Sequence, residues 1–457
     1  MAAIPPAGEV CKDCWQKQAG VAWIGPVMLR EENLEFGFVA QREDSSRLKA
    51  PLAEQLLTFQ EFGRRTRAAE TTAMKSCGEE VRVPTYVNEF WTSKQRAANR
   101  LHEVSYRACF KPQLPRFFIQ RLTAPDELVY DPFMGRGTTV IEAALLGRVP
   151  CGCDISPVSL VLTSPRLHPP QLEQVTQRLR EIDYSAAREM PEDLLVFYHP
   201  ETLREICALK DYLFKRRQSG ENDGVDDWLR MVAVNRLTGH SPGFFSVYTL
   251  PPNQAVSVLA QKKINEARGQ EPPRRQVAEI IGRKSRQLLV DCNAAVRQAL
   301  AGVRGRAKLL TQHAGSVPEI SSGSVSLVVT SPPFLDVVDY AGDNWLRCWF
   351  IGVDAAAVKL TVPRKLAEWQ RAMAEVFREL HRVLRPGGHV AFEVGEVRGG
   401  KVDLAAAVVP CGIEAGLKPL LILINAQPFT KTANCWGVDN NDKGTNTNRV
   451  VVFRKDG

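Results

Sequence analysis

The sequence predicts an α/β fold, namely a doubly wound, mostly parallel sheet of about seven strands interrupted by a large helical insertion. Three observations lead to this prediction. Short apolar runs alternate with helical patterns from about residue 127, the alternation stops near Pro165, and strand patterns return after about Val303. The segment between Pro165 and Val303 is far longer than ordinary loops of about 2–6 residues, so we interpret it as a functional insertion.

The composition is that of an ordinary globular enzyme. The chain has 457 residues, of which 44% are hydrophobic and 24% are charged. The apolar runs, such as that at Leu420 to Ala426, are too short to span a bilayer, and the N-terminus lacks the basic and apolar regions of an export signal. The odd count of eleven cysteines fits reduced thiols. We therefore expect a cytoplasmic protein, nucleoid-associated in a prokaryote, without membrane contact.

Residues 1–80 mix proline, glycine and charged residues without a sustained period, so we expect an irregular N-terminal extension. This segment contains a single CxxC motif, Cys11 to Cys14. A structural zinc site needs four ligands, and no second CxxC or HxxxH pair follows nearby. Two thiols in a flexible segment are therefore favoured over a metal knuckle completed from elsewhere, and we expect no metal.

Residues 81–165 are expected to hold N-terminal helices and the first half of the α/β fold. A strand is predicted at 127–130, a helix that Gly147 can cap at 138–146, and the next strand at 149–153. The helical insertion is expected at 166–303 and the second half of the fold at 304–457. The strands of that second half are expected at 307–310, 325–329, 388–392, 419–424 and 449–453.

The strongest sequence signal for a ligand is the segment Asp131-Pro132-Phe133-Met134-Gly135-Arg136-Gly137-Thr138-Thr139. It lies where a predicted strand ends and a helix begins, which is where open α/β sheets bind ligands. Gly135 and Gly137 allow a tight turn and a close approach of the backbone to a ligand. A threonine at the helix start can cap it.

Asp154, at the end of the next predicted strand, is the second half of this signal. A carboxylate there can accept hydrogen bonds from both hydroxyls of a ribose. The alternative is an N-cap for the segment after Ile155. The sequence lacks the GxxxxGK[ST] pattern, so it has no phosphate cradle of the nucleotide-hydrolase kind.

The two elements together resemble the cofactor-binding strands of the amino-methylating DNA methyltransferases, which read DPFxGxGTT followed by GxD. The resemblance implies a class I methyltransferase (Rossmann-like) fold and S-adenosylmethionine as cofactor. The segment Phe110-Lys111-Pro112 is similar to the family's other cofactor-side motif. The family's third strand usually carries an Asp near the adenine, and residues 311–316 lack it. The cofactor-binding residues that we predict are Phe110, Lys111, Pro112, Asp131, Phe133, Gly135, Gly137, Thr138, Asp154 and Ile155.

The segment Ser331-Pro332-Pro333-Phe334 follows the predicted fourth strand. An aromatic exocyclic amine is a poor nucleophile because its lone pair is delocalised into the ring. Two acceptors on its N–H groups, the Ser331 hydroxyl and a carbonyl near Pro332, would favour a pyramidal nitrogen. Neither proline has an N–H and Pro333 keeps Pro332 extended, so the loop carbonyls remain available. Phe334 offers a face on which a base flipped out of the duplex can stack.

This tetrapeptide resembles the family's catalytic (S/D/N)PP(Y/F) motif, and we predict that Ser331, Pro332, Pro333 and Phe334 are catalytic. In the family, Ser before the two prolines is associated with cytosine N4 and Asp with adenine N6. The resemblance therefore favours a cytosine-N4 DNA methyltransferase, with adenine N6 as the nearest alternative. An RNA amino-methyltransferase and a non-catalytic nucleic-acid-binding protein are further alternatives. Carbon-5 methylation would need a cysteine nucleophile in this loop, which is absent.

The insertion is our candidate for recognition of double-stranded DNA. From Lys262 to Lys308 it carries twelve basic residues against four acidic ones, which equals the formal net charge of +8 for the whole chain. Amide, guanidinium and aromatic groups precede this basic stripe. The alternative is a packed helical subdomain with ordinary surface charge. A cognate restriction endonuclease is expected as a genetic partner, not necessarily a physical one. The DNA-binding residues that we predict are Asn235, Arg236, Phe244, Phe245, Tyr248, Lys262, Lys263, Arg274 and Arg275.

Overall fold

The computed structural model describes residues 50–92, 98–106, 109–187, 189–249, 255–333, 335, 340–358, 363, 365–397, 402–426 and 447–457. The chain divides into two compact units, Met1–Glu43 and Asp44–Gly457, and all described residues belong to the second. The motif Cys11 to Cys14 therefore lies outside the described residues. The predicted insertion is not a separate unit, since it falls within Asp44–Gly457 together with both halves of the α/β fold.

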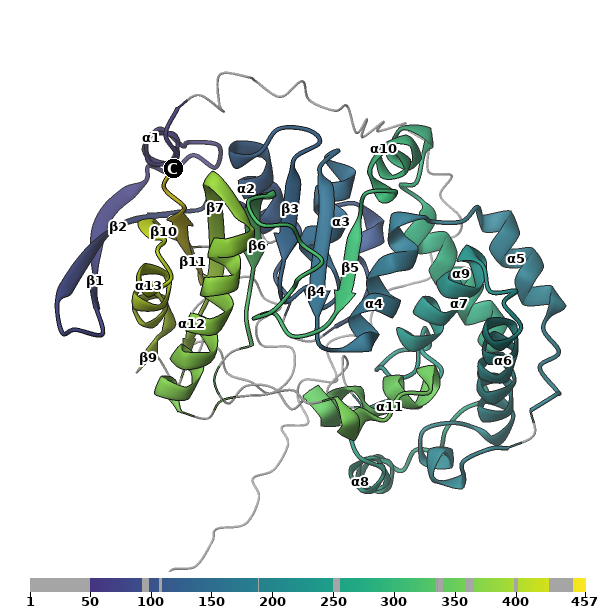
Figure 1. The fold of residues 1–457 in the computed structure, drawn as a ribbon. Helices are drawn as coiled ribbons and strands as arrows, with labels where there is room; N and C mark the ends of the chain where they lie inside the picture. The colour runs from purple at the N-terminus through teal and green to yellow at the C-terminus, as the bar shows by residue number, and fades with distance from the viewer. Residues whose placement is uncertain are drawn as a thin grey trace, which may run out of the picture. The chain divides into compact units, whose positions relative to one another are not determined.

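A nine-stranded sheet organises this unit, in the order β1-β2-β10-β11-β7-β6-β3-β4-β5 (Figure 1). Neighbours from β5 to β7 pair in parallel, whereas β11 is antiparallel to both β7 and β10. From β3 the chain adds strands first on one side and then on the other, which confirms the doubly wound fold. The strands are β3 (Leu128–Asp131), β4 (Val149–Asp154), β5 (Lys308–Thr311), β6 (Val325–Thr330), β7 (Leu384–Val394), β10 (Lys418–Ala426) and β11 (Thr447–Arg454).

The seven predicted strands are present, and the sheet has two more at its β10 edge. The hairpin of β1 (Arg67–Met74) and β2 (Glu80–Asn88) joins it there, with β2 parallel to β10. The prediction of an irregular extension over residues 1–80 is therefore wrong for β1, and α1 (Leu52–Leu57) precedes this hairpin. The sequence does not reveal this strand because β1 is almost fully exposed. Its residues therefore show no alternation of apolar and polar side chains. Its main-chain pairing with β2 holds it in the sheet.

Helices cover both faces of the sheet, so the central strands are buried on both sides. On one face, Tyr130 and Val328 pack with helices α12 (Leu366–Val383) and α13 (Leu404–Glu414). On the other, strand residues one position away pack with α2 (Gln113–Leu122) and α3 (Thr138–Leu145). This double burial explains the nearly continuous apolar runs of β3 and β6. A small separate sheet pairs β8 (Glu396–Val397) with β9 (Val402–Asp403).

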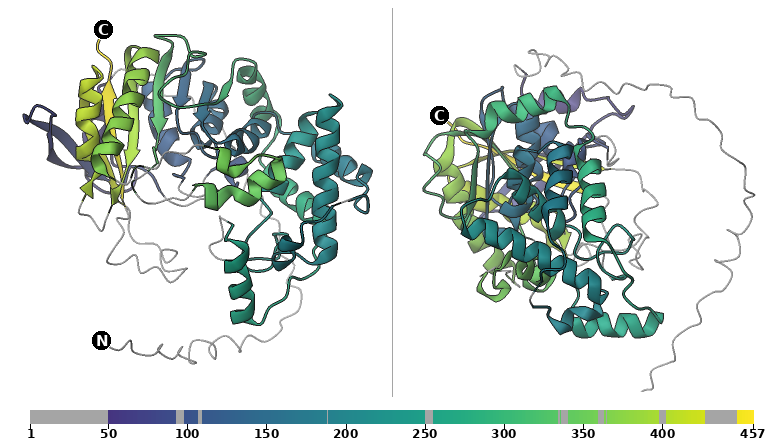
Figure 2. Two further views of the ribbon diagram at one scale, coloured as in Figure 1. Left: turned by 60° about the horizontal axis from the view of Figure 1, so that its bottom comes forward. Right: turned by 90° about the vertical axis from the view of Figure 1, so that its right-hand side faces the viewer.

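The insertion is helical, as predicted, and packs beside the sheet with α4 and α11 (Figures 1 and 2). Its apolar side chains belong to one buried cluster that also includes side chains of α3, so the insertion is continuous with the core. The helices here are α4 (Pro157–Thr163), α5 (Leu172–Glu181), α6 (Pro200–Gln218), α7 (Gly224–Val234), α8 (Val258–Arg268), α9 (Val277–Leu289), α10 (Ala294–Arg304) and α11 (Tyr340–Ile351). Short 3-10 turns are η3 (Arg100–His102), η4 (Ser164–Leu167), η5 (Glu192–Val196) and η6 (Ala355–Ala357). In the described part of the chain, no helix is long and apolar enough to cross a membrane.

Candidate active site at the carboxyl ends of β3, β4 and β6

The loop from Asp131 to Gly137 connects β3 to α3 and turns tightly at two glycines. Gly135 and Gly137 both have positive φ, +50° and +73°, and Gly137 is the residue before the first turn of α3. A Cβ on Gly137 would lie 2.4 Å from a side-chain carbon of Thr163. Only glycine fits this position without displacing α4, because both its backbone angle and its surroundings exclude a side chain. We call residues 131–137 the glycine loop.

Asp154, at the end of β4, holds the glycine loop from the side. Its Oδ2 accepts a hydrogen bond from the Gly135 main-chain N–H at 2.8 Å, and its Oδ1 accepts one from the Ser156 N–H at 2.8 Å. Burial raises the pKa of this carboxyl, while the two main-chain bonds act in the opposite direction. The side chain is only half-buried, so its carboxylate can still accept further hydrogen bonds from a ligand.

Asp131 connects the glycine loop to the loop after β6. Its Oδ1 accepts a hydrogen bond from the Thr330 hydroxyl at 2.6 Å and another from the Phe133 N–H at 3.1 Å. The side chain is buried, and burial raises its pKa to about 7. The Thr139 hydroxyl adds a second tie to β6 by donating to the Val329 carbonyl at 3.0 Å. The ends of two adjacent strands are therefore held in one fixed arrangement.

Ser331 and the two prolines after it leave the end of β6 beside the end of β7. Ser331 lies beside the carboxyl of Glu393, near the end of β7, and its hydroxyl lowers the pKa of that carboxyl. Glu393 accepts a hydrogen bond from the Asn448 side-chain amide at 3.2 Å. Burial raises the Glu393 pKa, and Ser331 and Asn448 oppose that rise. Pro333 is fixed from the other side, since its carbonyl accepts the Trp369 indole N–H at 2.9 Å. Phe334 lies outside the described residues.

Two buried arginines hold the segment before α2 against the glycine loop. Arg136 donates to the Val104 carbonyl at 3.0 Å and to the Phe110 carbonyl at 3.2 Å. Arg166, fully buried, donates to the Leu101 carbonyl at 3.0 Å and also to the Arg136 carbonyl. Sequence reasoning missed both residues, because buried arginines that bind main-chain carbonyls leave no pattern in the sequence.

The other predicted cofactor residues lie around this loop. Phe110 and Lys111 are half-buried and Pro112 is buried. Burial, together with the charge of Arg136, lowers the pKa of Lys111. Thr138 begins α3 and accepts a hydrogen bond from the Arg136 Nε at 3.1 Å. Ile155 follows Asp154 and is half-buried.

Comparisons with known proteins agree with this site. Residues 8–161, which include the glycine loop and Asp154, match the family model of the N6 and N4 methyltransferases, described as DNA methylase. The chain is 28% identical over 155 residues to the type II methyltransferase M.MvaI of Kocuria varians. The aligned region covers 33% of this chain and 30% of the relative. It is 20% identical over 285 residues to the type II methyltransferase M.BsoBI of Geobacillus stearothermophilus. This aligned region covers 56% of this chain and 53% of the relative. Over these parts of its length the chain is therefore similar to the amino-methylating DNA methyltransferases.

The chain spans between about a third and a half of the length of these two relatives, 30% and 53%. Among solved structures, the rRNA methyltransferase AviRa of Streptomyces viridochromogenes is 12% identical, with a TM-score of 0.31 over 80% of this chain and 93% of that one. The fold assignment rests on strand order and direction. The family match ends before Ser331, so it bears on the cofactor half of the site and not on the catalytic loop.

Most residues predicted to read DNA are packed inside the protein. Asn235 is 5% exposed and its side chain donates to the Ser105 carbonyl at 2.8 Å. Arg236 is 8% exposed, bonds to Asn235 and stacks on the ring of Phe244 at 4.0 Å. Phe244 and Phe245 are also buried. The prediction for these four residues is wrong in this conformation, because buried side chains cannot reach a base edge. They form the core that joins the insertion to the segment before α2.

The other predicted DNA-contacting residues differ in exposure. Arg274 forms ion pairs with Glu201 at 2.8 Å and Glu205 at 2.7 Å, so acidic neighbours already neutralise its charge. Arg275 is half-buried. Tyr248 is half-buried beneath the guanidinium of Arg268 at 4.0 Å.

Lys262 and Lys263, by contrast, are exposed on the outer face of α8. That face also presents Leu259, whose side chain is 75% exposed. The inner face of α8 is held in place, since the Gln261 side chain donates to the Tyr248 carbonyl at 3.1 Å and Asn265 donates to the Val196 carbonyl at 2.7 Å. Across the described ranges, no group of three or more His, Cys, Asp or Glu side chains could hold a metal ion.

Proposed function

We propose that the chain transfers a methyl group from S-adenosylmethionine to the exocyclic amino nitrogen of a base flipped out of double-stranded DNA, with cytosine N4 as the favoured target. The observation that carries the proposal is the 2.6 Å hydrogen bond from Thr330 to Asp131. It fixes the loop bearing Ser331 next to the glycine loop, at the carboxyl ends of adjacent parallel strands. Open α/β sheets bind ligands at this edge.

The residues around the glycine loop fit S-adenosylmethionine. Asp154 uses one lone pair of each oxygen on a main-chain N–H, so acceptors remain for the two ribose hydroxyls. Asp154 supplies negative charge that favours a sulfonium cation. The main chain at Gly135 turns with a positive φ of +50°, which a glycine adopts without strain. When bound, the cofactor supplies an electrophilic methyl group.

Glu393 gives Ser331 a defined direction in this chemistry. In this proposal the Ser331 hydroxyl donates to the neighbouring Glu393 carboxyl, so that the lone pairs of its oxygen accept an N–H of the target amine. Methyl transfer would form the N–C bond and break the S–C bond. The methylated nitrogen would then be positively charged and would have to lose one proton. Ser331 can take that proton as it gives its own to Glu393, whose raised pKa makes it the better proton acceptor. Positioning and proton removal then need no covalent intermediate.

We assign the exposed face of helix α8 as the surface that contacts the DNA backbone. It follows a short segment anchored to α11, where the Ala255 N–H donates to the Asp343 carbonyl at 3.3 Å and Trp345 donates to the Val256 carbonyl at 3.3 Å. Helix α11 comes directly after the catalytic loop in the chain, and α8 lies beside it in Figure 1. Lys262 and Lys263 are therefore available to phosphates near the site.

The choice of base rests on Ser331 alone, since the family places Asp at this position for adenine N6. Product analysis tests it directly. The protein is incubated with labelled S-adenosylmethionine and DNA of varied sequence, the DNA is digested, and the nucleosides are identified by mass spectrometry. We expect N4-methyldeoxycytidine. N6-methyldeoxyadenosine would overturn the cytosine assignment, and no transfer to any DNA would overturn the enzymatic one. The type II names of the relatives also support a restriction–modification setting, with an endonuclease as genetic partner.

A further inference from the structure

A cavity lies between α5, α7 and α10. Its volume is about 460 Å³, within the range of small-ligand sites. Arg304, near the end of α10, comes just before the amino end of β5, whereas Ser331 follows the carboxyl end of β6. Since β5 and β6 belong to the same run of parallel strands, the cavity and Ser331 lie at opposite edges of the sheet. In Figure 1, α10 is at the upper edge of the sheet and α11 at the lower.

Three nitrogen-bearing side chains gather at this cavity. Arg297 donates from Nη2 to the Pro170 carbonyl at 3.0 Å, from Nε to the Cys292 carbonyl at 3.0 Å, and from Nη1 to the Pro169 carbonyl at 2.5 Å. The Arg304 guanidinium contacts Nδ1 of His168. Within the described residues, neither arginine forms an ion pair with a carboxylate. Burial, followed by the charges of Arg304 and Arg297, lowers the pKa of His168, and all three side chains line the cavity.

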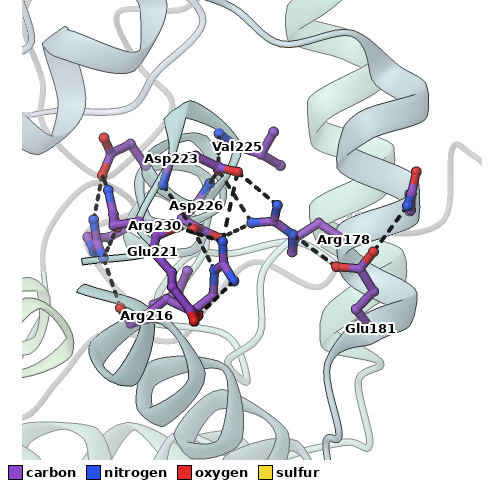
Figure 3. A network of polar contacts seen from close by, with 12 residues as sticks. Arg178, Glu181, Arg216, Glu221, Asp223, Val225, Asp226 and Arg230 are labelled. Atoms are coloured by element: carbon purple, nitrogen blue, oxygen red, sulfur yellow. Dashed lines mark hydrogen bonds and ion pairs between the residues drawn. The ribbon is translucent and has the colours of Figure 1, made fainter. Parts of the chain in front are cut away.

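One acid, Asp223, also lines the cavity, and it pairs with Arg178, not with Arg297 or Arg304. Its carboxylate accepts hydrogen bonds from the Arg178 guanidinium at 2.8 and 3.3 Å, and from the main-chain N–H groups of Val225 and Asp226 at 2.9 and 3.0 Å (Figure 3). These bonds use both of its oxygens. Asp223 therefore caps α7 and pairs with Arg178, and it does not balance the charges of Arg297 and Arg304.

The wall between α5, α6 and α7 is rigid. Asp226 is fully buried, and its carboxylate joins Arg178 of α5 to Arg216 of α6, the latter at 2.8 Å (Figure 3). A buried carboxylate held by two guanidinium groups fixes the three helices relative to one another. The cavity is therefore a preformed hollow with apolar surfaces beside its cationic side. These apolar surfaces come from Leu167, Pro169, Pro170, Val225, Leu300 and Ala301.

We propose that this cavity binds a small organic phosphate of mononucleotide size, with its phosphate between Arg304, Arg297 and His168 and its apolar part against the prolines and Leu300. A phosphate oxyanion would supply the negative charge that these two arginines lack, and guanidinium groups match its geometry. The apolar wall favours an organic phosphate over the inorganic ion. This inference is independent of the proposed methyl transfer.

Calorimetric titration of the full-length protein tests the proposal with thymidine monophosphate, thymidine and inorganic phosphate as probes. We expect saturable binding of thymidine monophosphate and at least tenfold weaker binding of the other two probes. Arg304→Gln should weaken thymidine monophosphate binding at least tenfold. Ala301→Trp should abolish it by filling the hollow, and because Ala301 is exposed the larger side chain need not disturb the core.

Arg306→Gln is the matched control, because this arginine lies two positions further along and pairs with Asp126 outside the cavity. We expect it to bind like the wild type. The proposal is overturned if thymidine binds as tightly as its monophosphate, if no probe binds, or if both the Arg304 and Ala301 variants bind like the wild type. Failure of these titrations leaves methyl transfer to DNA unaffected, so the two proposals can be judged separately.

Discussion

Ser331 and the buried Glu393 lie side by side at the ends of adjacent parallel strands, β6 and β7, where the Ser331 hydroxyl lowers the pKa of the Glu393 carboxyl. Glu393 is 8% exposed and its second partner is the Asn448 amide at 3.2 Å. A serine that donates to such a carboxyl has a fixed proton direction and acceptor lone pairs on its open side. This relationship underlies the first two predictions.

Ser331→Ala should keep cofactor binding and lose turnover. The substitution removes an acceptor from the target amine but leaves the glycine loop and Asp154 unchanged. We expect methylation at least about 100-fold slower, the usual contribution of a positioned proton-transfer group. The measurements are tritium transfer to DNA and calorimetric binding of S-adenosylhomocysteine. Ser324→Ala, at the opposite end of β6, is the control and should retain activity. Loss of cofactor binding in a folded Ser331→Ala protein would contradict the assigned role.

Glu393→Gln should change the pH profile of methylation. Burial raises the pKa of Glu393, so the carboxylate becomes protonated as the pH falls through a value above that of an ordinary glutamate. The methylation rate of the wild type should therefore fall as the pH is lowered. Glu393→Gln should be slower overall, and its rate should fall less at low pH. Rates measured from pH 5 to 8 at saturating cofactor and DNA test this. An unchanged fall at low pH in the variant would show that another group controls it.

Asp131 should make the unfolding free energy depend on pH. Its pKa is raised to about 7 in the folded protein, above the unfolded value of about 3.9. Its stabilising contribution is therefore complete below pH 4 and is lost as the pH rises through 7, by up to about 4 kcal/mol. Asp131→Asn should reduce this decline in urea unfolding between pH 4.5 and 8. Asp456→Asn, at the exposed C-terminus, should leave it as in the wild type. Identical pH dependence in both variants would argue against a neutral Asp131.

Gly137→Ala should destabilise the protein and weaken cofactor binding. The new Cβ would meet Thr163 at 2.4 Å, and the φ of +73° is unfavourable for alanine. We expect a loss of at least about 1–3 kcal/mol in the free energy of unfolding. Gly302→Ala is the control, since Gly302 lies within α10 with no atom near its Cβ position. That change should be neutral or stabilise the helix by up to about 1 kcal/mol. Equal stability of the two variants in urea unfolding would refute the steric argument.

Replacing both Lys262 and Lys263 by Ala should weaken DNA binding without changing cofactor affinity. Each phosphate contact contributes about 0.9 to the slope of log affinity against log salt, so the slope should decrease by up to about 2. Fluorescence anisotropy with a labelled duplex at several salt concentrations measures it. Arg274→Ala is the comparison, because Glu201 and Glu205 already pair with this residue, and it should have little effect. A larger effect from Arg274 than from the two lysines would place the DNA on a different surface.

Much of the fold and of the cofactor site could be predicted from local sequence patterns. Double burial makes the central strands β3 and β6 continuous apolar runs, and glycines occupy the two positions of positive φ in the glycine loop. The glycine loop and Asp154 could be recognised for this reason, since their roles depend on local geometry at strand ends. The hairpin of β1 and β2 could not, because its stability comes from pairing with a strand more than 300 residues away.

The sequence by itself determined which residues of the candidate site adjoin the strand ends. The tertiary structure decided which polar groups are buried and which residues they contact. Glu393 looks like any strand residue until β6 and β7 pair and bring it to Ser331. Asn235 and Arg236 look like base-reading groups until the insertion packs them inside. Arg297 and Arg304 look like ordinary surface cations until the helices around them enclose a cavity. Burial and partners depend on contacts between distant segments, which no local pattern records.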